Sequence, residues 1–196
     1  MKKLTKSMAL ALLAASCSCV VANAQLFEVD QANQPTPLGY FPLSPGAGVG
    51  QEFNPSLSGL DFVDLWIFSE APVGPAGFSV RIREGSITGG ILGESGLAMI
   101  GSPPTLGPTH FSFPSTVGLT GGATHVIELL QLAGGAGWGA GYGPNSGYAD
   151  GQALVGGNPV GFDLWFREGV AVPEPGIWTL GLAGVVMLGV SRRRRQ

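Results

Sequence analysis

Cysteine is almost absent from this sequence. The 196 residues include two cysteines, Cys17 and Cys19, and both fall within the first twenty residues. The rest of the chain can therefore form no disulfide and no cysteine-ligated metal site, even in an oxidising compartment. A domain built from that remainder must be held together by its hydrophobic core.

Basic side chains are also scarce. Between residues 25 and 170 there is no lysine, and three arginines stand against twelve acidic side chains, which gives this stretch a net charge of −9. Such a charge keeps an exported domain soluble, and it disfavours nucleic acid and anionic membrane surfaces as partners. The lack of lysine also argues against a Gly-rich phosphate-binding loop, which uses one to hold the phosphates.

Long hydrophobic runs are missing except near the two ends. At the amino end a lysine-rich start precedes a short apolar run over 8–15, and the small-residue site Ala22-Asn23-Ala24 follows. This order is typical of a secretory signal peptide over residues 1–24, cleaved before Gln25. A lipoprotein box ending at Cys17 is the less favoured alternative, because the leucine usual three residues earlier is missing.

The second uncharged run, over 176–190, precedes four consecutive arginines. As a helix it would measure about 22 Å at about 1.5 Å per residue, which is short for a bilayer core of about 30 Å. Arginines after such a span stop its transfer and stay on the cytoplasmic side. Pro173, Glu174 and Pro175 precede the uncharged run, and the two prolines favour an extended, non-helical conformation there. The pattern fits a plain C-terminal anchor or a sorting signal read by a membrane enzyme.

The order Pro-Glu-Pro, short apolar span and arginine cluster resembles the PEP-CTERM sorting signal of Gram-negative bacteria, although Gly176 and Ile177 replace the Ser or Thr frequent in that family. The resemblance implies that residues 171–196 are a sorting signal read by an exosortase, a membrane-embedded cysteine transpeptidase-like enzyme, which removes the tail at or near Pro-Glu-Pro. It also implies export, an inner-membrane-anchored intermediate with a short transmembrane helix, and then a place at the cell surface or outside the cell. The signal residues are Pro173, Glu174, Pro175, Arg192, Arg193, Arg194 and Arg195.

Residues 25–170 are expected to form one all-β passenger domain. Short apolar runs lie between Gly, Pro, Ser and Asn, with almost no helical periodicity, which is typical of an antiparallel β-sandwich. In the clearest strand, 78–84, Phe78, Val80 and Ile82 alternate with polar side chains. No helix longer than about two turns is expected in this domain. Further strands are expected over 26–29, 48–53, 61–69, 90–93, 97–100, 109–113, 124–132 and 162–167.

The same stretch resembles the jelly-roll-like sandwiches that commonly precede such tails and are often compared with carbohydrate-binding modules. The shared motifs include an early Gln-x-Phe, a Leu-Thr-Gly-Gly turn before a long strand, a Tyr-Ala-Asp-Gly-Gln loop and a closing Asp-Leu-x-Phe strand. These motifs locate turns and strand ends. The resemblance therefore implies a fold, and it supplies no ligand and no catalytic residue.

No constellation of residues points to catalysis. His110 and His125 are the only histidines, they share no metal-ligand spacing, and Gly-x-Ser-x-Gly is absent. We therefore expect that this protein is not an enzyme. We also expect that it has no catalytic residue, no metal ligand and no cofactor. A structural Ca²⁺ is the less favoured alternative, because acidic side chains are plentiful but no Asp-x-Asp-x-Asp-Gly loop offers the roughly six to eight oxygens it needs.

Two short sequences recur in the domain. Asp64-Leu65-Trp66 recurs as Asp163-Leu164-Trp165, and Arg83-Glu84-Gly85 recurs as Arg167-Glu168-Gly169. One interpretation is a shared site with acids from two strands. The preferred interpretation is that similar strands meet similar surroundings.

The best candidate for ligand binding is the Gly-rich segment 134–151, which is expected to be a loop. Its Trp138, Tyr142 and Tyr148 offer flat rings with polar edges, a type of surface on which sugar rings stack. The favoured alternative is that these rings cap the core. The whole chain is expected to be an exported, non-catalytic surface or matrix protein associated with exopolysaccharide. A carbohydrate-binding module is the alternative, and a glycan hydrolase is less favoured.

Overall fold

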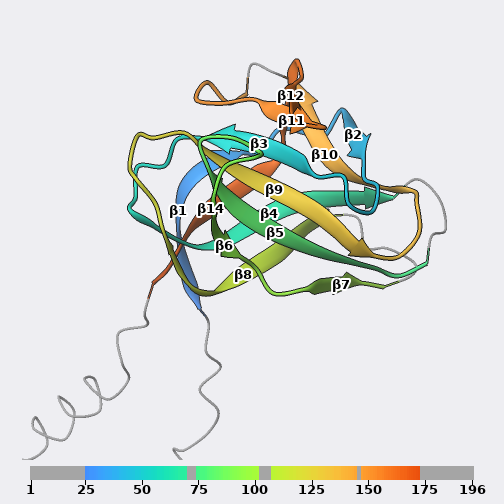
Figure 1. The fold of residues 1–196 in the computed structure, drawn as a ribbon, viewed down its shortest axis with the longest axis horizontal. Helices are drawn as coiled ribbons and strands as arrows, with labels where there is room; N and C mark the ends of the chain where they lie inside the picture. Colours follow the sequence, from blue (N-terminus) through green and yellow to red (C-terminus); the bar gives the residue numbers. More distant parts are fainter. Residues whose placement is uncertain (1–24, 70–73, 102–106, 145–146, 173–196) are drawn as a thin grey trace, which may run out of the picture. The chain divides into compact units, whose positions relative to one another are not determined.

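The computed structural model describes residues 25–69, 74–101, 107–144 and 147–172. Residues 27–173 form one compact unit, and the other unit, 1–26 and 174–196, lies almost wholly outside the described residues. The regular structure of the described residues consists of strands and includes no helix. They form two antiparallel sheets that pack into a sandwich (Figure 1). The predicted all-β, antiparallel sandwich is therefore confirmed.

The first sheet is built around β4 (Gly59–Ser69), which pairs with three other strands. One edge of β4 pairs with β8 (Gly107–Gly118), and the other pairs with β14 (Phe166–Val172) and then β10 (Trp138–Pro144). The remaining members are β1 (Leu26–Asn33), beside β14, and β2 (Gly39–Pro42) and β13 (Phe162–Leu164), beside β10.

The second sheet is centred on β9 (His125–Ala133), which lies between β3 (Val49–Phe53) and β5 (Ala76–Glu84). The outer members are β6 (Ile91–Glu94) and β7 (Ala98–Ile100), which pair with β5, and β11 (Ala153–Val155) and β12 (Asn158–Pro159), which follow β3.

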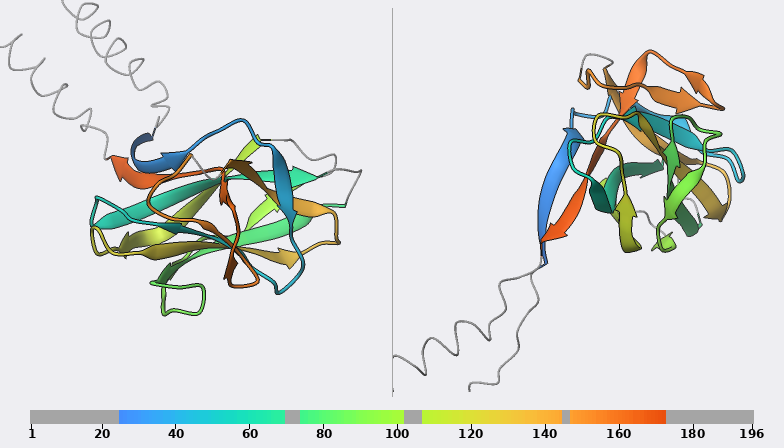
Figure 2. Two further views of the ribbon diagram at one scale, coloured as in Figure 1. Left: turned by 90° about the horizontal axis from the view of Figure 1, so that it is seen from above. Right: turned by 60° about the vertical axis from the view of Figure 1, so that its left-hand side comes forward.

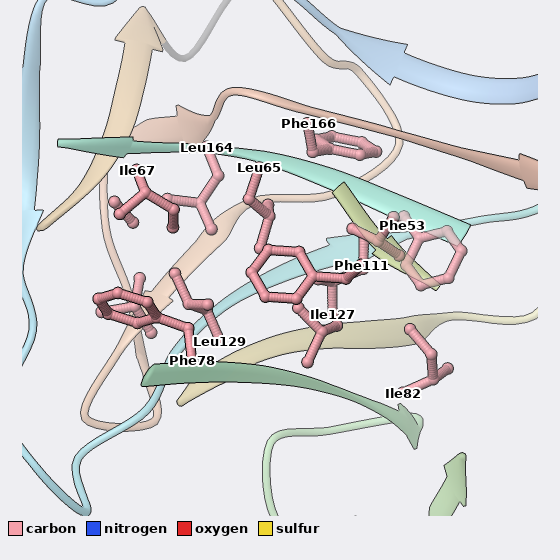
Figure 3. Close-up of a cluster of buried hydrophobic side chains, with 14 of the residues drawn as sticks. Phe53, Leu65, Ile67, Phe78, Ile82, Phe111, Ile127, Leu129, Leu164 and Phe166 are labelled. Carbon is pink, nitrogen blue, oxygen red and sulfur yellow. The ribbon is translucent and has the colours of Figure 1, made fainter. Parts of the chain in front are cut away.

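The hydrophobic core fills the space between the sheets. Phe78 and Ile82 of β5 point inward and are fully buried, as the alternation predicts. Phe111 of β8 is also buried, as predicted. Leu65 and Ile67 reach the core from β4, and Figure 3 shows side chains of both sheets meeting there. Each large buried apolar side chain contributes about 1.5–3 kcal/mol, which allows a stable fold without disulfides.

The sequence pattern does not predict β2, β10, β11 and β12. β11 and β12 are only three and two residues long, so neither can show an alternation. In β10 every second residue from Gly139 to Gly143 is glycine, so one face of this strand carries no side chains. The prediction that 134–151 is a loop is wrong for 138–144, because backbone pairing with β4 and β2 orders this stretch as a strand.

The first and last described strands are neighbours. β1 and β14 lie side by side at the edge of the first sheet, as both views in Figure 2 show. Gly169 allows their close approach, because a Cβ at this position would collide with the backbone carbonyl oxygen of Glu28. The beginning of β1 and the end of β14 therefore lie at one edge of the sandwich.

Candidate functional site

The outer faces of the two sheets differ in chemistry. On the second sheet, Arg81 pairs with Glu94 at 3.0 Å and Arg83 pairs with Glu128 at 2.6 Å. Ion pairs of this kind are common on solvated strands, and each contributes little to stability. The second sheet therefore carries ordinary surface ion pairs, together with exposed apolar side chains such as Leu132 and Met99.

The outer face of the first sheet carries a row of three polar side chains from three adjacent strands. Asp64 of β4 lies opposite His110 of β8 on one side and Arg167 of β14 on the other. His110 Nδ1 lies 2.7 Å from one carboxylate oxygen of Asp64, and Arg167 Nε donates to the other. Asp64 is 2% exposed, whereas the side chains of His110 and Arg167 are 41% and 43% exposed.

The charge of Asp64 is stabilised within this row. Burial by itself raises the pKa of Asp64, but the hydrogen bonds to His110 and Arg167 and the positive charge of Arg167 outweigh burial and hold the pKa below its usual value. A carboxylate held by two partners fixes their orientation in turn. The row therefore presents the outward parts of His110 and Arg167 in defined positions.

Aromatic side chains border the row on one side. Phe62 precedes Asp64 by two residues on β4 and stacks on the ring of His110 at 5.5 Å. Phe27 of β1 contacts Phe62 at 4.7 Å and His110 at 5.2 Å, although β14 lies between β1 and β4 in the sheet. A Cβ at Gly169 would collide with the backbone of Glu28, so this glycine lets β1 lie close to β14.

A second set of rings borders the row on the other side. Trp66 follows Asp64 by two residues and meets Trp165 edge-on at 5.7 Å. Next to them, Phe68 stacks on Tyr40 of β2 at 5.0 Å. Trp66 and Tyr40 lie over Gly141 and Gly139 of β10, where any side chain would displace them. We call the polar row and these two sets of rings the outer aromatic face. Its members are Phe27, Tyr40, Phe62, Asp64, Trp66, Phe68, His110, Trp165 and Arg167.

The sequence signal for the outer aromatic face is that strand β4 has apolar side chains on both of its faces. The run 61–69 is apolar on both faces for part of its length, which predicts a central strand. One face of this strand packs into the core, and Trp66 and Phe68 point outward from the other face. The repeated Asp-Leu-Trp does bring Trp66 and Trp165 together. It does not bring the aspartates together, since Asp163 instead accepts a hydrogen bond from Gln51 at 3.3 Å.

The structure places the three predicted sugar-contacting rings differently. Trp138 is 1% exposed and packs edge-on against Phe78 at 5.4 Å. Tyr148 is buried against Phe166, and burial raises the pKa of its hydroxyl to about 12. Tyr142 is half-buried among other rings at the end of the core. Trp138 and Tyr148 therefore present no ring face to a surface ligand, which agrees with the alternative that they cap the core.

We expect Trp138→Ala to lower the free energy of unfolding by about 3–5 kcal/mol, because it removes a large ring from the core and leaves a cavity. Urea unfolding of the variant and the wild-type protein measures this difference. Trp66→Ala, on the half-buried outer face, is the matched control and should cost clearly less. Equal costs for both tryptophans would contradict the placement of these two rings.

One buried acidic side chain has no ionic partner. Glu168 of β14 is 0% exposed, and no side chain of the described residues donates a hydrogen bond to its carboxylate. Burial and the nearby charge of Asp30 raise its pKa to about 8. The arginines of the described residues each pair with other acids. Glu168 is therefore largely protonated at neutral pH.

The described residues include no group of three or more His, Cys, Asp or Glu side chains that could hold a metal ion. The calcium alternative thus gains no set of ligands from this part of the chain. His125 is buried beside Phe53, and its ring lies near the backbone of Thr120. The two histidines lie on different sheets.

The predicted sorting and cleavage residues, apart from Gln25, lie outside the described residues. Among the residues that are described, none belongs to a helix with the length and apolarity needed to cross a membrane. The predicted transmembrane helix over 176–190 also falls outside this part of the chain.

Comparison with known families identifies the tail that follows the sandwich. Residues 171–195 match the PEP-CTERM protein-sorting motif. The chain is thus an antiparallel β-sandwich protein that carries a PEP-CTERM protein-sorting motif. The motif implies export, a membrane-anchored intermediate, processing by an exosortase and then surface display. Among curated proteins the comparison finds no match.

Proposed function

We propose that this chain is a non-catalytic surface protein whose sandwich associates with the exopolysaccharide around the cell. The sorting motif supports a location where such polymers are present. The observation that carries the proposal is the outer aromatic face, where rings border hydrogen-bonding side chains. In this proposal residues 1–24 are the signal peptide, 25–170 the passenger domain and 171–196 the sorting signal.

The arrangement of the polar side chains supports a non-catalytic role. His110 binds Asp64 through Nδ1, as a catalytic histidine would, but no serine, threonine or cysteine side chain of the described residues donates to it. Acyl transfer by a triad needs such a nucleophile. The buried acids Glu168 and Asp163 lie inside the sandwich, away from water that a glycosidase must activate.

Cell fractionation tests the proposed location and association. We expect the processed protein to sediment with the extracellular matrix of an exosortase-positive host that makes exopolysaccharide, and to pass into the medium in an isogenic strain that makes none. Loss of the matrix removes the surface to which the sandwich binds. An identical distribution in both strains would refute the association with exopolysaccharide.

The alternative is a dedicated carbohydrate-binding module with affinity for one defined glycan. The fixed orientation of His110 and Arg167 favours this alternative, since specificity for a sugar requires hydrogen-bonding groups in defined positions. Binding to a single glycan on an array, with no retention by the matrix polymer, would favour the module over the matrix protein.

A further inference from the structure

We propose that the outer aromatic face is a binding subsite for the pyranose rings of a neutral polysaccharide, with Trp66 as the stacking surface and Arg167 and His110 as the hydrogen-bonding groups. This inference rests on the proposed association with exopolysaccharide. It goes further, because it assigns that association to particular residues and to one charge class of polymer.

The stacking surface is fixed by the sheet beneath it. Trp66 lies above Gly141, with the nearest ring atom only 2.9 Å from where a Cβ would be. Its other neighbour, Trp165, meets it edge-on, and Trp165 is almost fully buried. Trp66 is half-buried and is the most exposed of the three tryptophans in the described residues. A rigid ring on a flat sheet binds a ligand with little loss of side-chain entropy.

The hydrogen-bonding groups lie one step along the sheet from the stacking surface. Asp64 and Trp66 are two residues apart on the same face of β4, which corresponds to about 7 Å along the strand. This separation is close to the length of one sugar unit. A pyranose resting on Trp66 would therefore place its hydroxyl groups beside Arg167 and His110.

A sugar hydroxyl group both donates and accepts hydrogen bonds. Arg167 and His110 together can provide the complementary acceptor and donors. Arg167 uses Nε for Asp64, and its guanidinium has further N–H donors on a side chain that is 43% exposed. His110 uses Nδ1 for Asp64. With Nδ1 donating to the carboxylate, the Nε2 of a neutral ring is an acceptor.

Charge favours a neutral polymer over a polyanion. The carboxylate of Asp64 offsets the positive charge of Arg167 within the row. The arginines of the second sheet are likewise paired with acids, and residues 25–170 carry a net charge of −9. A polyuronate would be repelled by this domain as a whole, whereas a neutral sugar would not.

Affinity electrophoresis of the full-length protein in mild detergent tests the subsite. The gels contain neutral polysaccharides (hydroxyethylcellulose, glucomannan and dextran), a polyuronate (alginate), or the exopolysaccharide purified from the host that processes the chain. We expect retardation by at least one neutral polymer. Trp66→Ala should weaken that binding by about tenfold or more, Trp66→Phe by less, and Arg167→Gln by about threefold to tenfold.

Matched controls come from the opposite sheet. Leu132→Ala removes an exposed apolar side chain of β9, and Arg81→Gln removes an arginine that pairs with a glutamate through Nε. Both should bind like the wild-type protein. Thermal unfolding of each variant, with and without polymer, separates lost binding from lost folding, since a folded Trp66→Ala protein should lose the stabilisation that the polymer gives.

The outcomes separate this inference from the function on which it rests. If a neutral polymer binds and the Trp66 and Arg167 variants bind it equally well, the subsite is refuted while the matrix association stands. Retardation by alginate alone refutes the neutral assignment. If no polymer retards the protein, the subsite is refuted, and the fractionation experiment decides separately on the matrix association.

Discussion

Replacing Pro173, Glu174 and Pro175 by alanine is expected to abolish exosortase processing, so that the full-length protein accumulates in the membrane. The family match places these residues within the sorting motif, directly after β14. Prolines hold a segment extended and keep it out of helices, the form in which a peptide enters an active site. Alanine is a good helix former and removes both the shape and the charge. Immunoblots of a tagged protein in exosortase-positive and exosortase-null hosts measure the processed fraction.

The control and the companion variant sharpen this prediction. Pro35-Thr36-Pro37 is a second Pro-x-Pro sequence in the chain, between β1 and β2, and its replacement by alanines should leave processing intact. Replacing Arg192, Arg193, Arg194 and Arg195 by serine should reduce retention in the membrane before cleavage, because cationic residues stop transfer. A tail that remains attached equally in both hosts would show that it is a plain anchor.

Glu168→Gln is expected to stabilise the sandwich at pH 8–9 by up to about 4–5 kcal/mol, with almost no effect near pH 4. The pKa of Glu168 is raised from 4.5 to about 8 by burial and by the charge of Asp30. Below pH 4.5 the folded and unfolded states both hold the proton. As pH rises from 4.5 to about 8 the unfolded state loses its proton first, so stability falls, and above pH 8 the loss levels off.

The difference in the free energy of unfolding between Glu168→Gln and the wild-type protein reports on the titration of Glu168. Other acids also titrate, since the pKa of Asp64 is lowered and burial raises that of Asp163, but their contributions cancel in the difference. Urea unfolding at pH 4, 6, 7 and 9 gives the curve. Glu84→Gln, at an exposed position at the end of β5, is the control and should show no such rise. A difference for Glu168→Gln that is constant across this range would contradict the raised pKa.

The strands with alternating apolar side chains were predictable because their signal is local. In 78–82 every second side chain is apolar, and this pattern alone assigns Phe78 and Ile82 to the core, as found. β10 has no such pattern, since glycines occupy its outer face. Its position depends on pairing with β4 and β2, and therefore on residues far away in the sequence.

The aromatic residues were harder to assign than the strands. An isolated Trp or Tyr in a Gly-rich segment fits a surface loop and a buried strand equally well. Trp138 is inward because β10 pairs with β4 in the register that places Trp138 opposite the buried Ser69. Trp66 is outward because its neighbours Leu65 and Ile67 occupy the core side of the strand. The choice between the two tryptophans was therefore a matter of register, which no local pattern contains.

The sequence by itself determined the sorting motif, the absence of disulfides from residues 25–170 and the all-β class of that stretch, because each depends on residue types or on their short spacing. Only the tertiary structure decided the outer aromatic face and the burial of Glu168. Asp64 and Arg167 are 103 residues apart, and so their contact exists only after β4 and β14 pair. The environment of a side chain, and with it its exposure and its pKa, is set by neighbours that folding brings from distant parts of the chain.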